Sequence, residues 1–166
     1  MEKIVKACTF TGHRAEKLPW GYDESDPRCI QLKEQLRDVV RSLYDSGCRH
    51  FLCGMATGCD LYFGEAVAAL REEKPDITLE AAIPYEGQAN QWSPSARRRY
   101  FRLAEQCDIQ TILHHSYTPD CMMDRNRYMV DHADVLVAAY SGEAGGTRAT
   151  MLYAMRQGKQ IIELAI

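Results

Sequence analysis

The sequence lacks the patterns that identify several classes of protein. Its seven cysteines are odd in number and none are spaced as CxxC, so neither a disulfide framework nor a common zinc motif is indicated. No apolar run approaches the roughly 18 residues that a membrane-spanning helix needs. Charged residues interrupt the N-terminal stretch where a signal peptide would have its apolar core. We therefore expect a protein of the reducing cytoplasm with no membrane partner.

Two phosphate-binding motifs and a strong positive charge are also missing. Neither GxxxxGK[ST] nor GxGxxG occurs. The net charge of -3 gives no general attraction to DNA or RNA, so we expect no nucleic-acid partner. One basic run, "ARRRYFR" at 96–102, is interpreted first as a solvated helix face and second as part of an anion site. His114, His115 and His132 lack the spacing of a metal set, and no metal is expected.

Short apolar runs alternate with helical patterns along the 166 residues. The alternation predicts right-handed strand–helix–strand units and one α/β domain over 1–166, a Rossmann-like three-layer αβα sandwich with a mainly parallel sheet. The segment 12–28 is longer than most connections, and such segments are usually lids, binding loops or disordered. Strands are predicted at 4–10, 50–54, 78–84, 109–113, 134–140 and 160–166, and helices around 36–44 and at 59–74, 95–107, 122–133 and 147–158. The unbroken apolar character of 134–140 indicates a strand buried on both faces. Gly47 and Gly158 fit the ends of the helices that precede them.

Glycine-rich and polar segments follow the predicted strands, whereas the opposite edge of the sheet carries plain turns. Ligands of open parallel sheets bind beyond the carboxyl ends of the strands. Glycine lets the backbone approach a phosphate closely, and helix N-termini supply unpaired N–H donors. The sequence therefore predicts a site for a nucleotide-like anion at this edge. The predicted ligand-binding residues are Gly12, His13, Arg14, Gly54, Met55, Ala56, Gly58, Asp60, Pro84, Tyr85, Gln88, Trp92, Arg125, Asn126, Gly145, Gly146 and Thr147.

Some of these residues also have a purely structural interpretation. Thr57 and Asp60 fit a capping box at the start of a helix, and Thr147 fits an N-cap. Tyr85 and Trp92 either stack on a base or pack against their neighbours.

The pair Arg125 and Asn126 has two interpretations of its own. Arginine binds phosphate with two parallel hydrogen bonds, which suits a ligand contact. The alternative is a position on the helix surface or an ion pair to Asp124 or Asp131.

Five segments, in this order and spacing, resemble the YpsA-like family of the SLOG superfamily of Rossmann-like domains. They are "FTGHRAEKL", "GMATGCDLYFGEAV", "PYEGQANQW", "RNRYMVD" and "GGTRATMLYA", and the resemblance runs from residue 10 to about 162. "GMATGCD" is also similar to the SGxAxGxD segment of DprA-like relatives. The resemblance implies a nucleotide or nucleotide-derived ligand at the edge identified above. It also implies a homodimer, because relatives commonly dimerise. A protein partner is the alternative, because a sensor can act by binding another protein.

The resemblance also raises a catalytic alternative. LOG-type phosphoribohydrolases of the same superfamily cleave the N-glycosidic bond of nucleoside monophosphates and carry PGGxGTxxE with an essential Glu. Gly146 and Thr147 match the GT, but the Glu position falls on Thr150. Because glycosidic cleavage needs a carboxylic acid, Asp60 and Glu65 become the candidate catalytic residues, with Glu86 and Asp131 as further acids.

Three functions follow from these patterns. The first is binding or sensing of a nucleotide-derived ligand such as NAD, ADP-ribose or a nucleoside monophosphate, with no other cofactor. The second is N-glycosidic hydrolysis. The third is DprA-like single-stranded DNA binding, which the segment "GMATGCD" suggests; the acidic net charge disfavours it, and among the charged residues only the run Arg97–Arg99 favours it.

Overall fold

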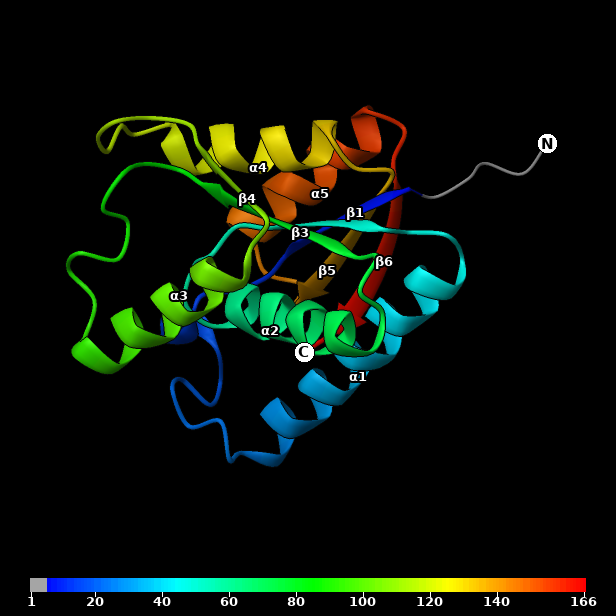
Figure 1. Cartoon of the computed structure of the whole chain (residues 1–166). Helices are drawn as coiled ribbons and strands as arrows, with labels where there is room; N and C mark the ends of the chain where they lie inside the picture. The colour runs from blue at the N-terminus through cyan, green and yellow to red at the C-terminus, as the bar shows by residue number, and fades with distance from the viewer. Residues whose placement is uncertain (1–5) are drawn as a thin grey trace.

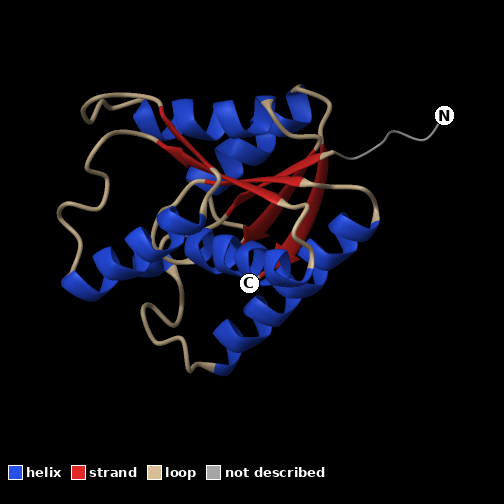
Figure 2. Ribbon diagram, in the orientation of Figure 1, coloured by secondary structure: helices blue, strands red, loops and turns tan. Residues whose placement is uncertain are grey.

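The computed structural model describes residues 6–166 and shows a parallel sheet between two layers of helices (Figures 1 and 2). The sheet has six strands in the order β4-β3-β2-β1-β5-β6, and every neighbouring pair is parallel. The predicted Rossmann-like sandwich is confirmed, although Ile4 and Val5 of the first predicted strand lie outside the described residues. The strands are β1 (Ala7–Thr11), β2 (His50–Cys53), β3 (Thr78–Ile83), β4 (Ile109–Ile112), β5 (Val135–Tyr140) and β6 (Gln160–Ala165).

The helices divide between the two faces of the sheet. α1 (Pro27–Asp45), α2 (Cys59–Glu73) and α3 (Pro94–Gln106) cover one face, and α4 (Cys121–Asp131) and α5 (Gly146–Arg156) cover the other (Figure 1). The chain moves outward from β1 to β4 and then returns to the other side of β1 for β5 and β6. With right-handed crossovers, this reversal puts the later helices on the opposite face. The reversal makes the gap between β1 and β5 the topological switch point, where ligands of such sheets bind.

Side chains cap some of these helices at their N-termini and not others. Asp26 accepts a hydrogen bond from the Arg28 backbone at the start of α1, and Ser93 caps α3 in the same way. α2, α4 and α5 have no side-chain cap. The capping box and N-cap interpretations are therefore wrong, since Gly58 precedes α2 and Gly145 precedes α5. The N–H groups of α2, α4 and α5 are left for other partners.

The main core lies between the sheet and the α1–α3 layer. Phe10 of β1 stacks on Phe63 of α2 with ring centroids 5.0 Å apart. The central strand β5 is buried from Val135 to Ala139, which confirms the prediction of a strand covered on both faces. All seven cysteines are free. Within residues 6–166, no helix is both long enough and apolar enough to span a membrane.

The long segment between β1 and α1 packs against the α1–α3 layer. It contains a short 3₁₀ helix, η1 (Ala15–Lys17). Trp20 is buried and donates a hydrogen bond from Nε1 to the Tyr62 hydroxyl on α2, at 3.3 Å. Arg99 of α3 bridges Glu24 of this segment and Glu65 of α2. These contacts hold the later part of the segment against α2 and α3, and its first residues lie beside β1.

Candidate functional site: a cleft at the switch point

A cleft of about 600 Å³ opens beyond the carboxyl ends of β1 and β5. Its walls come from the end of β1 with η1, the start of α2, the α4 helix and the start of α5. The topology thus brings together four segments that are far apart in the sequence. The predicted site residues that line it are Gly12, His13, Arg14, Ala56, Asp60, Arg125, Asn126, Gly145, Gly146 and Thr147.

Arg125 is the buried cation of this cleft, with only 4% of its surface exposed. Its Nη1 donates to the Gly54 carbonyl, and its Nε donates to Asn126 Oδ1 at 2.8 Å. No carboxylate of the described chain lies within ion-pair distance of its guanidinium. Burial lowers the pKa of Arg125, and the nearby Asp60 opposes that effect. A buried cation without an acidic neighbour in contact gains free energy when an anion reaches it.

The alternative partners proposed for Arg125 are engaged elsewhere. Asp124 accepts from His114 Nε2 at 3.0 Å, and Asp131 accepts from the Tyr153 hydroxyl at 2.7 Å. The interpretation of Arg125 as a surface residue or as the ion-pair partner of either aspartate is therefore wrong.

Asp60 is the buried acid of the cleft, with 7% of its surface exposed. Its Oδ2 accepts a hydrogen bond from the Ala56 backbone at 3.2 Å. Burial raises the pKa of Asp60, while Arg125 acts in the opposite direction. Both side chains pack on Gly54, where a Cβ atom would lie 2.8 Å from Arg125 Nη1 and 2.8 Å from Asp60 Oδ2. Glycine at position 54 is thus required by these two side chains, and it does not line the cleft.

Gly58 affects the cleft through the position of α2. It has φ +80°, and a Cβ atom there would lie 2.6 Å from the Ala15 backbone nitrogen. The next residue, Cys59, donates its N–H to the His13 carbonyl at 3.2 Å. Gly58 therefore lets α2 begin directly against the segment after β1. Neither Gly58 nor the buried Met55 is among the residues that line the cleft.

The N-terminus of α5 opens into the cleft. Gly145 has φ +154°, and a Cβ atom built on either Gly145 or Gly146 would meet no described atom within 4 Å. The uncapped first turn carries a partial positive charge that favours anions. Thr150, at the position of the glutamate in the hydrolase pattern, donates its hydroxyl to the Gly146 carbonyl at 2.9 Å. Its side chain is therefore bound to its own helix.

His13 links the two sides of the switch point. Its Nε2 lies 3.0 Å from Ser141 Oγ, so the segment after β1 is tied to the segment after β5. Burial and the positive charge of Lys17 lower the pKa of His13, and Glu143 acts in the opposite direction. The lowered pKa favours the neutral imidazole, and a bound anion would favour the protonated form.

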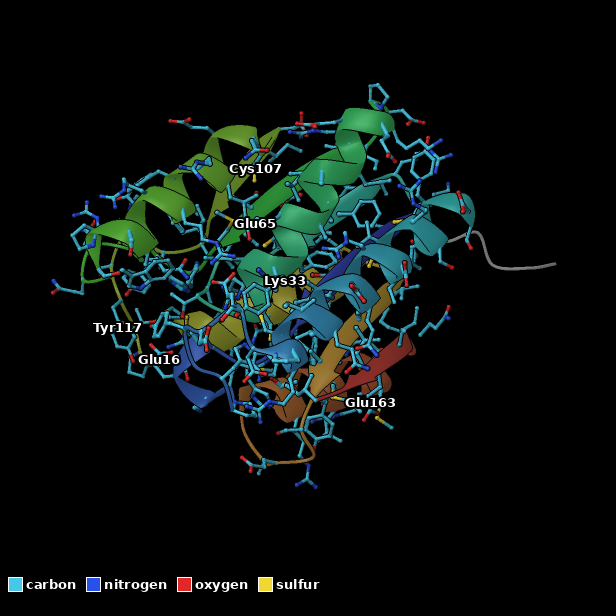
Figure 3. The ribbon with its side chains drawn as sticks, turned by 90° about the horizontal axis from the view of Figure 1, so that it is seen from below. Glu16, Lys33, Glu65, Cys107, Tyr117 and Glu163 are labelled. Carbon is cyan, nitrogen blue, oxygen red and sulfur yellow. The ribbon has the colours of Figure 1, made fainter. Side chains whose placement is uncertain are left out.

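A smaller hollow of about 80 Å³, here called the side pocket, adjoins the cleft. The two share Arg14, Ala56 and Met122. Its remaining lining residues are Glu16, Thr57, Tyr85, Gln88 and Trp92. Figure 3 shows Glu16 and Tyr117, the aromatic partner of Tyr85, on the same side of the molecule.

Tyr85 and Trp92 both pack against neighbouring aromatic residues, and stacking on a base stays a prediction. The Tyr85 ring packs edge-on against Tyr117 at 5.6 Å, and Trp92 packs edge-on against Tyr100 at 5.3 Å. Both residues also line the side pocket. Pro84 is buried and lines neither the cleft nor the side pocket.

Glu65 does not reach the cleft. It projects from α2 toward α3 and accepts two hydrogen bonds from Arg99, at 2.6 and 3.0 Å (Figure 3). Because Arg99 is held in this way, its charge is already paired, whereas Arg97 and Arg98 of the same basic run are exposed. Of the further acids, Asp131 binds Tyr153, and Glu86 lies 3.9 Å from His115. Asp60 is therefore the one predicted acid that lines the cleft.

Several cleft residues were not predicted from the sequence. Lys17 follows Arg14 by three residues, a spacing that puts both on one side of a 3₁₀ turn. Met122 precedes Arg125 by three residues, which places it one helical turn earlier on the same face of α4. These two spacings are the sequence signals for Lys17 and Met122. The remaining unpredicted lining residues are Phe10, Thr11, Glu143 and Ala144. In the part of the chain that the structure describes, no group of histidine, cysteine and acidic residues is placed to hold a metal ion.

The fold and the cleft define a Rossmann-like α/β domain with its candidate site at the switch point of the sheet. Residues 8–165 match the YpsA family model, described as "YspA SLOG family". The chain therefore belongs to the YpsA family of SLOG proteins.

Relatives of the chain include proteins from several bacteria. It is 25% identical to a UPF0398 protein of Staphylococcus epidermidis over 142 residues, which cover 84% of this chain and 75% of the relative. It is 26% identical to a UPF0398 protein of Halalkalibacterium halodurans, over 94% of this chain and 83% of the relative. It is 28% identical to the uncharacterised SPbeta prophage-derived protein YoqJ of Bacillus subtilis, over 79% of this chain and 84% of that protein.

Solved structures of DNA processing protein A share the fold. The Helicobacter pylori protein, described for its single-stranded DNA binding mode, matches with a TM-score of 0.62 and 14% identity over 96% of this chain. The Streptococcus pneumoniae protein matches with a TM-score of 0.61 and 15% identity, also over 96% of this chain. The chain spans 65% and 50% of these two proteins, respectively.

Proposed function

We propose that the protein binds or senses a nucleotide-derived ligand, such as a nucleoside monophosphate, ADP-ribose or NAD, with a phosphate group in the cleft. One observation carries the proposal: Arg125 lines the cleft, is buried, and has no carboxylate in contact. An anion that binds beside it makes direct hydrogen bonds to the guanidinium, and charge-assisted hydrogen bonds are stronger than neutral ones.

The surroundings of Arg125 support a phosphate as that anion. The uncapped N-terminus of α5 presents backbone N–H groups, and the adjacent glycines leave space for close approach. Arg14 and Lys17 add positive charge at the opening. The volume of about 600 Å³ exceeds what a lone phosphate needs and lies within the range of small-molecule pockets.

Titration with defined nucleotides tests the proposal. Thermal-shift and calorimetric titrations would use AMP, NAD and ADP-ribose, with Arg125→Gln as the variant and Arg97→Gln, on the exposed face of α3, as the matched control. A ligand at 100 times its dissociation constant should stabilise the wild type by about 2.7 kcal/mol. We expect Arg125→Gln to lose this stabilisation and Arg97→Gln to keep it. No stabilisation of the folded wild type by any of these ligands would contradict the proposal.

A second candidate function is hydrolysis of an N-glycosidic bond, which one feature of Asp60 favours. A carboxyl group whose pKa is raised by burial keeps its proton more readily and can act as a general acid. The test is release of free base from nucleoside monophosphates by the wild type, Asp60→Asn and Glu65→Gln. Hydrolysis predicts that Asp60→Asn abolishes turnover and that Glu65→Gln retains it. Turnover that survives in Asp60→Asn would remove this acid from the mechanism.

We also propose that the protein is cytoplasmic and that it does not bind single-stranded DNA. We further propose that it forms a homodimer or acts through a protein partner. The net charge of -3 and the ion-paired Arg99 disfavour a polyanion, even though the fold is shared with DNA processing protein A. A gel shift with single-stranded DNA at low salt should show no complex, and a salt-sensitive complex would contradict this expectation. Sedimentation equilibrium should give twice the mass of one chain if the protein dimerises by itself.

A further inference from the structure

The strand β4 leaves one edge of the sheet free. It pairs with β3 on one side, and no strand of residues 6–166 pairs with its other side. Leu113, directly after β4, donates its N–H to the Ile83 carbonyl at 3.0 Å. Because neighbouring residues of a strand turn their backbone groups to opposite sides, the N–H and C=O of Ile112 face the free side. A free edge of this kind is a template for another strand.

The sequence of β4 carries none of the features that usually protect an edge. Residues 109–112, "IQTI", include no charge and no proline, and their register with β3 is continuous over all four positions. The opposite edge strand, β6, contains Glu163. Ile109 and Ile112 are 44% and 46% exposed. The short length of β4 does not prevent pairing, since β2 also has four residues and pairs on both sides.

A hollow of about 240 Å³ lies between β3, β4 and α3. Its apolar lining residues are Ile83, Ala89, Tyr100, Phe101, Ala104 and Ile112. Gln110 of β4 donates from Nε2 to the Ala104 carbonyl at 3.0 Å, so Gln110 and Ile112, two positions on, face α3. Every second side chain of a strand paired with β4 would point to the same face. An apolar side chain of such a strand can therefore enter the hollow.

Arginines on the outer face of α3 extend this surface. Arg97, Arg98 and Arg102 line a groove of about 590 Å³, which shares Phe101 and Glu105 with the hollow. The three arginines are exposed and make no ion pair within residues 6–166. Glu105 is the one acid that lines the groove, so the groove is positive although the whole chain has a net charge of -3. Such a local excess of arginine favours an acidic partner.

We propose that the free edge of β4 and the α3 groove bind an extended, acidic segment of a partner protein. The backbone of this segment pairs with β4, an apolar side chain fills the hollow, and its carboxylates contact Arg98 and Arg102. A second copy of the chain is disfavoured, because two-fold pairing of β4 with β4 would bring the arginines of both α3 helices toward each other. A nucleic acid is disfavoured because it has no peptide groups to pair with the strand.

This inference rests on the proposed role of a protein partner and does not depend on nucleotide binding in the cleft. Selection of short, random, phage-displayed peptides on the immobilised full chain tests it. We expect the enriched peptides to combine aspartate or glutamate with alternating apolar residues. Fluorescence anisotropy then measures the affinity of the enriched peptides for the wild type and for variants.

Charge reversal on α3 tests the contact with the groove. Arg98→Glu with Arg102→Glu should weaken binding of the enriched peptides at least about 10-fold, because two charge pairs are lost. The control, Arg37→Glu with Arg156→Glu, changes the net charge equally at exposed positions of α1 and α5 and should bind as the wild type. Melting temperatures report whether both double variants fold.

Modified peptides test the pairing with β4 without a change in the protein. Methylation of one backbone nitrogen at a time removes one N–H donor of an enriched peptide. Since only alternate residues of an added strand turn their backbone toward β4, methylation should weaken binding at every second position. Uniform effects along the peptide would overturn the pairing.

The remaining outcomes separate this inference from the other proposals. No enriched peptide, or enriched peptides that bind both double variants equally, would overturn it and leave nucleotide binding in the cleft untouched. Single-stranded DNA that displaces the enriched peptides would assign the surface to nucleic acid and overturn it. A dimer in sedimentation equilibrium that Ile112→Lys dissociates would assign this edge to a second copy, whereas a dimer that persists would support a free β4 edge.

Discussion

Replacement of Gly146 by alanine should make the protein more stable and its ligand binding weaker. A Cβ atom at this position meets no described atom within 4 Å, and the backbone of Gly146 does not have a positive φ. The substitution therefore adds no strain to the fold, and it restricts the unfolded chain. The same methyl group occupies the space in front of the α5 N-terminus, where we place the phosphate.

Both effects have magnitudes that an experiment can resolve. A compatible glycine-to-alanine change raises the free energy of unfolding by about 0.4–1 kcal/mol. Loss of one hydrogen bond from a backbone N–H to a charged oxygen costs about 1.5–3 kcal/mol, which is roughly 10- to 150-fold in affinity. Urea denaturation measures the first quantity, and calorimetric titration with ADP-ribose measures the second.

Gly58→Ala is the control for this experiment. Its φ of +80° and the predicted contact of 2.6 Å with the Ala15 nitrogen both oppose a side chain. We expect a loss of at least about 2 kcal/mol in unfolding free energy. If Gly146→Ala were stabilised as expected but bound ADP-ribose with the wild-type affinity, the ligand would not contact the α5 N-terminus and this reasoning would be refuted.

Three further predictions concern charged groups. Because burial lowers the pKa of His13 and an anion favours its protonated form, ADP-ribose affinity should rise as the pH falls from about 8 to about 6, and His13→Gln should remove this dependence in calorimetry. Burial alone would raise the pKa of Glu80, but hydrogen bonds from Tyr128, His50 and Thr111 outweigh it and lower the pKa. The stability that ionised Glu80 contributes is therefore present above its ordinary pKa and is lost as the pH falls through the lowered pKa. Tyr128→Phe removes one of these hydrogen bonds and should lower the free energy of unfolding by about 1 kcal/mol at neutral pH. Urea denaturation should show a smaller loss in acid. Glu65→Gln should cost at most about 1 kcal/mol, because its ion pair with Arg99 is partly exposed, and should leave ligand affinity unchanged.

The fold could be predicted from the sequence because local patterns determine it. The run at 134–140 is predicted as a strand buried on both faces, and β5 is buried from Val135 to Ala139. Gly47 and Gly158, predicted to end helices, have φ values of +111° and +71° directly after the caps of α1 and α5. Strand alternation together with crossover handedness then leaves few topologies to consider.

The site could be predicted only to the level of the segments that form it. Gly54 and Gly58 follow β2 as expected, but whether a glycine faces a ligand or a neighbouring chain segment depends on packing across the molecule. Asp60 and Glu65 lie on one helix, yet five residues of separation turn Glu65 toward α3. The contacts that decide whether a residue faces the cleft or packs elsewhere, such as that of Arg99 with Glu65, join residues far apart in sequence. Such contacts leave no local pattern in the sequence.

A crystal structure of the protein with the nucleotide that gives the largest thermal shift tests the central claim most directly. We expect a phosphate group within hydrogen-bonding distance of the Arg125 guanidinium and of the backbone N–H groups at the start of α5. A nucleotide bound with its phosphate away from both groups would contradict it.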